Sequence, residues 1–333
     1  MNYITCNIWG YDKISTVIGI PRGLFFHLFN EGWVTFFKEL GYEVKISSPS
    51  NKKILNAGTQ VALSETCLPV KFYLGHVIEL ANAGVDYLFI PRMVSINNKE
   101  YLCPRFMGLP DTIEQTMSPL PPVITPTINL NNKEYNWKKA AEEVGKKLNI
   151  PTFKIFKAYI KGILEQKRAN KRKQGELRQK LNSKNKTILL VGRDYILEDE
   201  ITGIGIKEKI KSAGYEVITT NISTAGEIDK GSKYMDKRLY WTLNKRLFGS
   251  SLHLTHNGLI NGIVQVIAFG CGPDSLVCEL IERKVKEISS VPNLLLTLDE
   301  HTGEAGLYTR LEAFMDLLER RSQLNETHLS SHG

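Results

Sequence analysis

A short stretch that occurs in both halves of the chain constrains the fold most strongly. Gly-Tyr-Glu-Val stands at residues 41–44 and again at 214–217, each time after an apolar run and a stretch of helical spacing. Glycine is common just past the end of a helix, and here it leads into a run that favours a strand. Two such strand–helix–strand units indicate a parallel, doubly wound sheet in each half of the chain.

The expected strands and helices alternate along the sequence. Strands are expected at 16–22, 42–46, 85–90, 121–126, 187–192, 215–219, 262–269 and 293–298, and helices at 25–40, 52–63, 69–83, 203–213, 235–247 and 307–318. Prolines limit the strand at 121–126, which therefore suits an edge or terminal position. In sheets of this kind ligands bind beyond the carboxyl ends of the strands.

Residues 133 to about 183 read as a helical and strongly basic segment. Twelve Lys and Arg residues but only two Glu lie between residues 154 and 186. The first part carries an apolar stripe formed by Ile155, Phe156, Tyr159, Ile160, Ile163 and Leu164. Residues 165–185 are nearly all polar, as in a solvated helix or linker. We therefore expect an α/β protein with two doubly wound, mostly parallel-sheet domains, residues 14–132 and 187–322, joined by a basic helical segment, residues 133–186.

The composition fits a globular protein with two cores, because the 333 residues are 42% apolar. The N-terminus shows no signal peptide and no apolar run approaches the ~20 residues that span a bilayer, so we expect a cytoplasmic protein with no membrane partner. The net charge of +8 is concentrated in the basic segment. Its charged part has no interleaved aromatic residues, which is more typical of a solvated face or docking surface than of a nucleic-acid site.

Cys271 lies at a sharp corner between a buried strand and a helix. The apolar run ends at Gly270, and Pro273 marks the first turn of the helix, where its missing N–H costs nothing. The N–H groups and the dipole at a helix start favour a thiolate there. The position therefore suits metal ligation or redox chemistry.

Two further cysteines have similar surroundings. Cys67 also lies two residues before a proline that opens a helix, and Cys103 directly precedes Pro104. Three thiolates from separate loops would suit an iron–sulfur cluster with one open coordination position. Scattered cysteines are, however, often small core residues, and a single nucleophilic cysteine is a further alternative. Zinc is disfavoured because the chain has no Cys-x-x-Cys pair.

The chain has five cysteines, an odd number at wide spacings, which argues against a disulfide framework. Cys278 lies two turns into the helix that follows Cys271, between apolar neighbours. We favour a core thiol for it over a fourth cluster ligand. Cys6 precedes the first strand and is given no role.

Other candidate groups are fewer. Glu300, His301 and Glu304 follow the last strand at the same expected sheet edge, where they could supply a proton-transfer group or cap a helix. His253 and His256 flank an Asn-Gly turn and suit the surface better than a metal site. The pair Gly203 and Gly205 lacks the third glycine of a dinucleotide fingerprint, and the chain has no Walker A sequence.

Several longer motifs resemble those of the acyl-CoA dehydratase activase-related proteins. These are relatives of the iron–sulfur components of 2-hydroxyacyl-CoA dehydratases and of double-cubane cluster proteins. The motifs that carry the resemblance occur in order at residues 18–22, 65–71, 89–92, 101–105, 239–241, 269–275 and 296–306. The resemblance extends from about residue 16 to 320.

The resemblance implies a two-domain α/β protein that holds a [4Fe–4S] or double-cubane cluster between its domains, with Cys67, Cys103 and Cys271 as ligands. It also implies a separate ATP-hydrolysing activase that delivers single low-potential electrons, and a homologous second subunit or a homodimer. In the dehydratases the electron reduces a thioester carbonyl to a ketyl, which expels the 2-hydroxyl. The chain itself has no actin-like ATPase domain.

The leading expectation is therefore a redox protein of the dehydratase-component type, either a lyase or an oxidoreductase component. A cluster-carrying scaffold subunit without catalytic activity, or the activase itself, are the alternatives.

Overall fold

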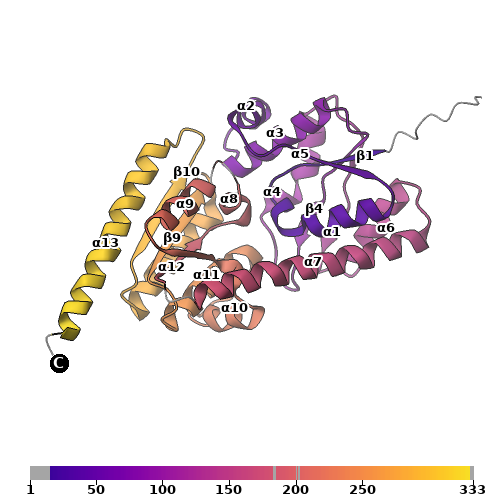
Figure 1. Ribbon diagram of the computed structural model, residues 1–333. Helices are drawn as coiled ribbons and strands as arrows, with labels where there is room; N and C mark the ends of the chain where they lie inside the picture. Colours follow the sequence, from indigo (N-terminus) through magenta and orange to yellow (C-terminus); the bar gives the residue numbers. More distant parts are fainter. Residues whose placement is uncertain (1–15, 183–184, 200, 202, 331–333) are drawn as a thin grey trace, which may run out of the picture.

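The computed structural model describes residues 16–330 apart from 183–184, 200 and 202, and it shows two lobes side by side (Figure 1). Each lobe is built on a four-stranded parallel sheet. The first sheet has the order β2-β1-β3-β5, formed by Glu43–Ile46, Val17–Ile20, Tyr87–Phe89 and Val123–Ile124. The second has the order β8-β7-β9-β10, formed by Glu216–Thr219, Thr187–Val191, Gly262–Ala268 and Asn293–Leu298.

The two sheets have the same topology. In each lobe the first strand lies between the second and the third, so the strand order reverses beside it. The Gly-Tyr-Glu-Val repeat leads into β2 and β8, the equivalent edge strands. The predicted α/β class with parallel sheets in both halves is confirmed.

Helices cover both sheets. The first lobe has α1 Phe26–Glu39, α2 Lys52–Val61, α3 Leu68–Asn82, α4 Pro104–Met107, α5 Leu109–Thr116 and α6 Trp137–Lys147. The second has α8 Asp194–Leu197, α9 Ile204–Ser212, the 3₁₀ turn η1 Thr220–Ile222, α10 Ala225–Ser232, α11 Thr242–His256, α12 Gly272–Ile288 and α13 Glu304–Ser330. None of the helices in the described ranges is long and apolar enough to cross a membrane.

The structure differs from the prediction in one helix and in one additional sheet. The helix expected at 235–247 starts only at Thr242, because the chain before it forms a bridge between Trp241 and Tyr101 of the other lobe. A small sheet that was not predicted pairs β4, Arg92–Ser95, with β6, Thr127–Asn129. Strands this short carry little periodicity, and long-range pairing decides where they form.

The basic segment is two helices rather than one. Helix α6 ends at Lys147, and Asn149 has a positive φ of 54° just before Pro151, which precedes the 30-residue helix α7, Thr152–Leu181. The apolar stripe predicted on α7 is also divided, because Ile155 is buried whereas Phe156 and Ile160 are exposed.

Helix α7 runs beneath both lobes and packs on each of them (Figure 1). Near its start it crosses α1 closely: a Cβ on Gly162 would lie 2.6 Å from the carbonyl oxygen of Gly32. Near its end, Leu177 packs on the core of the second lobe. The second half of α7 is therefore a packed element, not a free linker.

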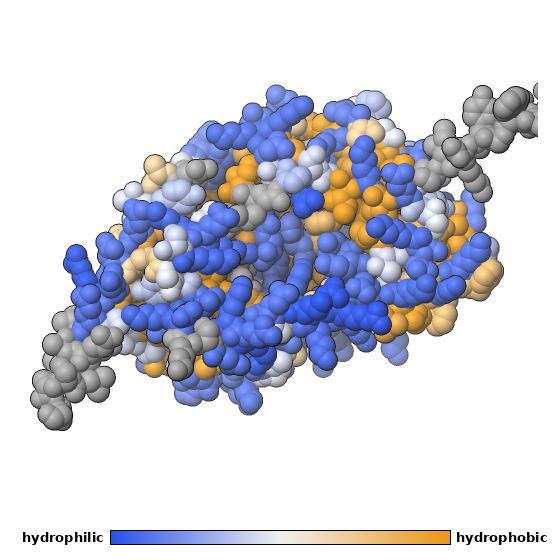
Figure 2. Space-filling model, viewed as in Figure 1, coloured by the Kyte–Doolittle hydropathy of each residue, from blue (hydrophilic) through white to orange (hydrophobic). Residues whose placement is uncertain are grey.

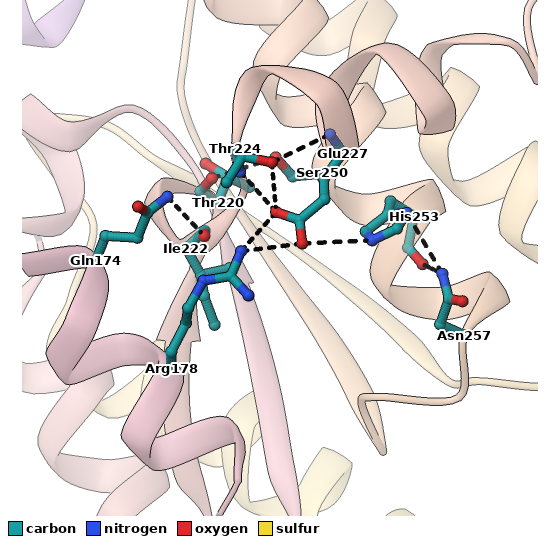
Figure 3. A network of polar contacts seen from close by, with 9 residues as sticks. All are labelled: Gln174, Arg178, Thr220, Ile222, Thr224, Glu227, Ser250, His253 and Asn257. Atoms are coloured by element: carbon teal, nitrogen blue, oxygen red, sulfur yellow. Dashed lines mark hydrogen bonds and ion pairs between the residues drawn. The ribbon is translucent and has the colours of Figure 1, made fainter. Parts of the chain in front are cut away.

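Polar contacts also fix the end of α7 to the second lobe (Figure 3). The guanidinium of Arg178 donates to both carboxylate oxygens of Glu227, at 2.9 and 2.7 Å. Glu227 completes a capping box with Thr224 at the start of α10. His253 lies 3.9 Å from the same carboxylate, so its ring is partly buried in this network rather than on the surface.

The apolar core is continuous between the lobes. Leu68 and Phe72 of α3 pack in one cluster with Ile196, Leu296 and Leu298 of the second lobe. Strands β7 and β9 are buried along their whole length, as expected for the centre of a parallel sheet covered on both faces. The lobes are therefore held against each other by a shared core.

Candidate functional site

Three of the cysteines occupy the same kind of position in the fold. Cys67, Cys103 and Cys271 are the N-cap residues of α3, α4 and α12, each with a proline in the first turn that follows. At the third corner, Gly270 has a φ of 77°, a left-handed conformation that glycine adopts readily, and this turns the chain from β9 into α12. The helix starts predicted after Cys67 and Cys271 are confirmed, and the short helix α4 after Cys103 was not predicted.

The three corners meet where the lobes touch. Tyr195 of α8 packs against two core clusters: Cys271 packs against the first of them, and Cys67 and Cys103 pack against the second. Its ring contacts that of Phe106, three residues after Cys103, edge to face at 6.0 Å between centroids. The thiols of Cys67 and Cys271 both act electrostatically on the Tyr195 hydroxyl, and Cys103 acts on Cys67. Cys67, Cys103 and Cys271, up to 204 residues apart in sequence (271 minus 67), therefore all lie in the region where the two cores adjoin Tyr195.

Burial disfavours the thiolate form of two of these cysteines, Cys67 and Cys271. It raises the pKa of Cys271 to about 12, with Asp274 adding to the rise and Arg193 opposing it. It also raises the pKa of Cys67. The expectation that the helix start makes Cys271 a thiolate is therefore wrong for the ligand-free chain, because loss of hydration outweighs the dipole. A bound metal would supply the positive charge that these sulfurs need to ionise.

A buried ion pair shapes the Cys271 corner. Arg193, at the carboxyl end of β7, donates through Nε to Asp274 Oδ2 at 3.0 Å and pairs through Nη2 with Oδ1 of the same carboxylate. Asn244 accepts a bond from Arg193 at 2.8 Å and donates to the carbonyl of Pro273 at 2.7 Å. All three side chains are almost fully buried. The first turn of α12 is therefore fixed from two sides.

Sequence patterns alone do not single out Arg193 or Tyr195. The internal repeat could have identified Arg193, but it gives no signal for Tyr195, whose equivalent in the first lobe is Leu24. Arg193 lies two residues after the first strand of its lobe, as Arg22 does in the first lobe. Both positions are at the point where the strand order reverses, the usual ligand edge of such a sheet.

Further contacts tie the cysteine loops together. Arg105 donates to the carbonyl of Glu65 at 2.7 Å, which joins the loops of Cys103 and Cys67. Two backbone hydrogen bonds of Tyr101 cross the lobe boundary. Its N–H donates to the carbonyl of Tyr240 at 2.8 Å, and its carbonyl accepts from the N–H of Thr242 at 3.0 Å. The arrangement of the three corners is thus fixed by hydrogen bonds as well as by the core.

The three candidates that follow the last strand, Glu300, His301 and Glu304, have different surroundings. Glu300 accepts from Lys71 Nζ at 2.8 and 2.6 Å, across the lobe boundary and one turn of α3 from Cys67. His301 is exposed, and its backbone N–H donates to Asp299 Oδ1 at 2.8 Å. The side chain of Glu304 lies outside the described part of the structure, as does Cys6.

Cys278 lies in the core of the second lobe and is only 1% exposed. It packs with Val277 and Ile281, and burial raises the pKa of its thiol. Its side chain therefore does not share the half-buried position of the other three.

The donor set at the lobe boundary consists of three half-buried thiols. Within the described ranges, no three His, Cys, Asp or Glu side chains lie close enough together to hold one metal ion. A cubane cluster is larger than an ion, and each of its ligands binds a different iron, so the ligands lie further apart. Cysteine thiolates are the usual ligands of such clusters, so the three half-buried thiols fit the group in their chemistry.

Comparison with known proteins gives one informative match. A family described as "CoA enzyme activase uncharacterised domain (DUF2229)" matches residues 17–222, which is more than half of the 333-residue chain. No curated protein matches. A solved structure, "Crystal structure of ZnuA", is 11% identical and covers 92% of this chain and 98% of that chain with a TM-score of 0.31, too low to support an argument. The family match over residues 17–222 shows that the chain belongs to the CoA enzyme activase uncharacterised domain family.

Proposed function

We propose that the chain is an iron–sulfur redox protein in which Cys67, Cys103 and Cys271 hold a cubane-type cluster between the two lobes. The observation that supports this most strongly is that three helix-capping cysteines pack against the two core clusters that adjoin at Tyr195. When bound, such a cluster supplies one-electron transfer, at a potential set by charge, hydrogen bonds and solvent access.

The residues around the thiols would hold and shield the group. Asp274 and Asn244 keep Arg193 beside the Cys271 corner, so a buried cation lies next to a thiol that must ionise. Burial raises the pKa of Tyr195 well above its usual value, so its hydroxyl stays protonated and can donate a hydrogen bond. The edge-to-face contact between Tyr195 and Phe106 would place apolar rings beside the group.

We further propose that the electron comes from a separate ATP-hydrolysing activase, and that the chain acts as a component of the 2-hydroxyacyl-CoA dehydratase type. Membership of a family described by CoA enzyme activases supports a place in such a system. A cluster-carrying subunit with no turnover of its own is the competing reading of the same site.

Electron paramagnetic resonance tests the redox role. The protein is reconstituted anaerobically with iron and sulfide and is then reduced with titanium(III) citrate. We expect a signal that appears on reduction and is lost on exposure to air. A reconstituted protein that takes up no electron from this reductant would contradict the redox role. Loss of the 2-hydroxyl from a 2-hydroxyacyl-CoA, with activase and ATP added, separates a catalytic component from a carrier.

A further inference from the structure

A large cleft lies between the lobes, on the side of α7 (Figure 2). Its volume is about 1360 Å³, more than the ~300–1,000 Å³ of most small-molecule sites. Helix α7 forms one long wall, from Tyr159 to Lys180. None of Cys67, Cys103 and Cys271 lines it, so the cleft is separate from the site described above.

The two ends of the cleft differ in chemistry. The first-lobe end is aromatic and is lined by Phe29, Trp33, Trp137 and Tyr159. Helix α7 and the wall toward the second lobe carry most of the charged residues. Over the whole cleft eight basic residues (Lys167, Lys171, Lys173, Lys180, Lys207, Lys211, Lys245 and Arg246) face five acidic ones (Glu100, Glu176, Asp194, Glu198 and Asp229), a surplus of three positive charges.

Part of this charge is not neutralised by the protein. Lys245 pairs with Glu100 and Asp229, and Arg246 with Asp194. Lys207 pairs with Glu198 and Lys173 with Glu31. The remaining basic residues of the cleft have no ion pair with any described residue: Lys167, Lys171, Lys180 and Lys211. Four lysines thus face the cleft without a partner, which favours an anionic ligand.

Buried polar atoms at the second-lobe wall also lack partners. Thr242 Oγ1 and Ser223 Oγ make no hydrogen bond, although these residues are only 7% and 8% exposed. Arg246 Nε, one helical turn after Thr242, is also without an acceptor. Leaving such a group unpaired costs on the order of 1–3 kcal/mol. Arg246 Nε can only donate, so the missing partner is an acceptor.

The start of α11 also favours a hydrogen-bond acceptor at this place. The helix has 15 residues, begins at Thr242 and carries no acidic residue in its first turn. The N-terminal end of a helix attracts negative charge. The dipole, the two hydroxyls and the guanidinium N–H therefore favour the same kind of group, a compact oxyanion.

We propose that this cleft binds an amphiphilic organic anion. Its tetrahedral oxyanion, a phosphate in the first instance, takes the unpaired hydrogen bonds of Thr242, Ser223 and Arg246. Its aromatic or apolar part packs on Trp33 and Trp137. The unpaired lysines of α7 and α9 attract it and lower its rate of escape. This site does not depend on the cysteines or on the redox role.

The test uses 8-anilinonaphthalene-1-sulfonate, an aromatic anion whose fluorescence rises in apolar surroundings, with inorganic pyrophosphate as competitor. We expect saturable binding that pyrophosphate displaces and that weakens at high salt. Displacement by ADP would identify a nucleotide-like occupant, and displacement by dodecyl phosphate an aliphatic one. Binding that none of the three phosphates displaces would overturn the proposal.

Matched variants locate the site. Thr242→Val should weaken pyrophosphate binding at least fivefold. Thr255→Val is the control, because that hydroxyl is also buried and unpaired on α11 but does not line the cleft. The surface variant Lys167→Gln/Lys171→Gln should also weaken binding, whereas Lys146→Gln should not. Equal dissociation constants for Thr242→Val and the wild type would contradict the site.

The same titration on Cys271→Ser keeps the two proposals apart. No cysteine lines the cleft, so this variant should bind pyrophosphate as the wild type does, even if it takes up no iron. Loss of anion binding in it would show that the cleft and the cysteine site are one site, contrary to the proposal.

Discussion

At the residue scale, one buried ion pair sets the conditions around Cys271. Arg193 and Asp274 are 5% and 1% exposed, and the carboxylate satisfies two of the guanidinium's donors. Removing one member of such a pair leaves the other charged in a medium that solvates it poorly. The corner that carries the cysteine therefore depends on a contact made by a residue 78 positions earlier in the chain (271 minus 193).

Asp274→Asn should lower the free energy of unfolding by about 3–5 kcal/mol, because it leaves the Arg193 charge buried without a counter-charge. Urea denaturation measures the change. Glu279→Gln on the same helix is the control, since its pair with Arg283 is exposed and should be worth less than about 1 kcal/mol. Equal losses for the two variants would contradict this account of the pair.

A buried histidine gives a second effect of this kind. His76 is fully buried on α3, its Nε2 lies 3.1 Å from Ser50 Oγ, and its Nδ1 has no partner. Burial lowers its pKa to about 3, with smaller effects from Arg22 and His27. In the unfolded chain the imidazole titrates near ~6.5. Below that pH the unfolded state binds a proton that the native state does not, so the free energy of unfolding decreases as the pH is lowered.

Between pH 7 and pH 5 this group should remove about 2 kcal/mol of stability, at roughly 1.36 kcal/mol per pH unit below ~6.5. His76→Gln should lose less over the same range, as measured by urea midpoints at both pH values. The exposed His256→Gln should behave as the wild type. A wild-type stability that does not change between these pH values would contradict the burial of a neutral ring.

The residue scale is also where sequence reasoning reached least far. Proline beside each cysteine identified the three corners, because capping is a local property. The pairing of Arg193 with Asp274 and the position of Tyr195 between the lobes depend on how the sheets are placed, which no local pattern records. For the same reason the thiolate expected at Cys271 was wrong: the helix start is visible in the sequence, but the burial that opposes it is not.

At the element scale, the caps and turns that the sequence makes explicit were predicted best. Gly41 and Gly214 end helices where expected, and both have φ near +87° (89° and 85°). The break between α6 and α7 was missed although Pro151 marks it in the sequence. The late start of α11 was missed because it depends on the long-range bridge between Trp241 and Tyr101. The apolar stripe on α7 was recognised, but which part of it is buried is decided by the helix it crosses.

The crossing of α1 and α7 gives a direct test. Gly162→Ala would place a Cβ 2.6 Å from the carbonyl oxygen of Gly32, and this should cost about 1–3 kcal/mol, because two helix backbones must separate. Gly175→Ala on the same helix meets no atom within 4 Å and should stabilise by about 0.5–1 kcal/mol. Thermal unfolding of both variants checks the sign of each change. Two changes of the same sign would contradict the close crossing.

At the scale of the whole molecule, the repeated strand–helix pattern predicts a parallel sheet in each half, with the carboxyl ends of its strands along one edge. Parallel sheets in both halves follow from the alternation of strands and helices, and the structure confirms them. The shared core and the Lys71–Glu300 pair across the boundary could not be predicted, because they join surfaces whose orientation depends on the entire fold. The division into domains at residue 186 stays a prediction. Helix α7, which precedes that position, packs on both lobes.

The central claim is that three cysteines from both lobes hold one cluster at their boundary. Iron and acid-labile sulfide per chain, with absorption at ~400 nm, test it most directly on anaerobically reconstituted protein. The wild type and Cys278→Ser should contain iron and sulfide and be coloured, whereas Cys67→Ser, Cys103→Ser and Cys271→Ser should each lose the cluster. A colourless wild type, or a triple serine variant that retains its iron and sulfide, would contradict the claim.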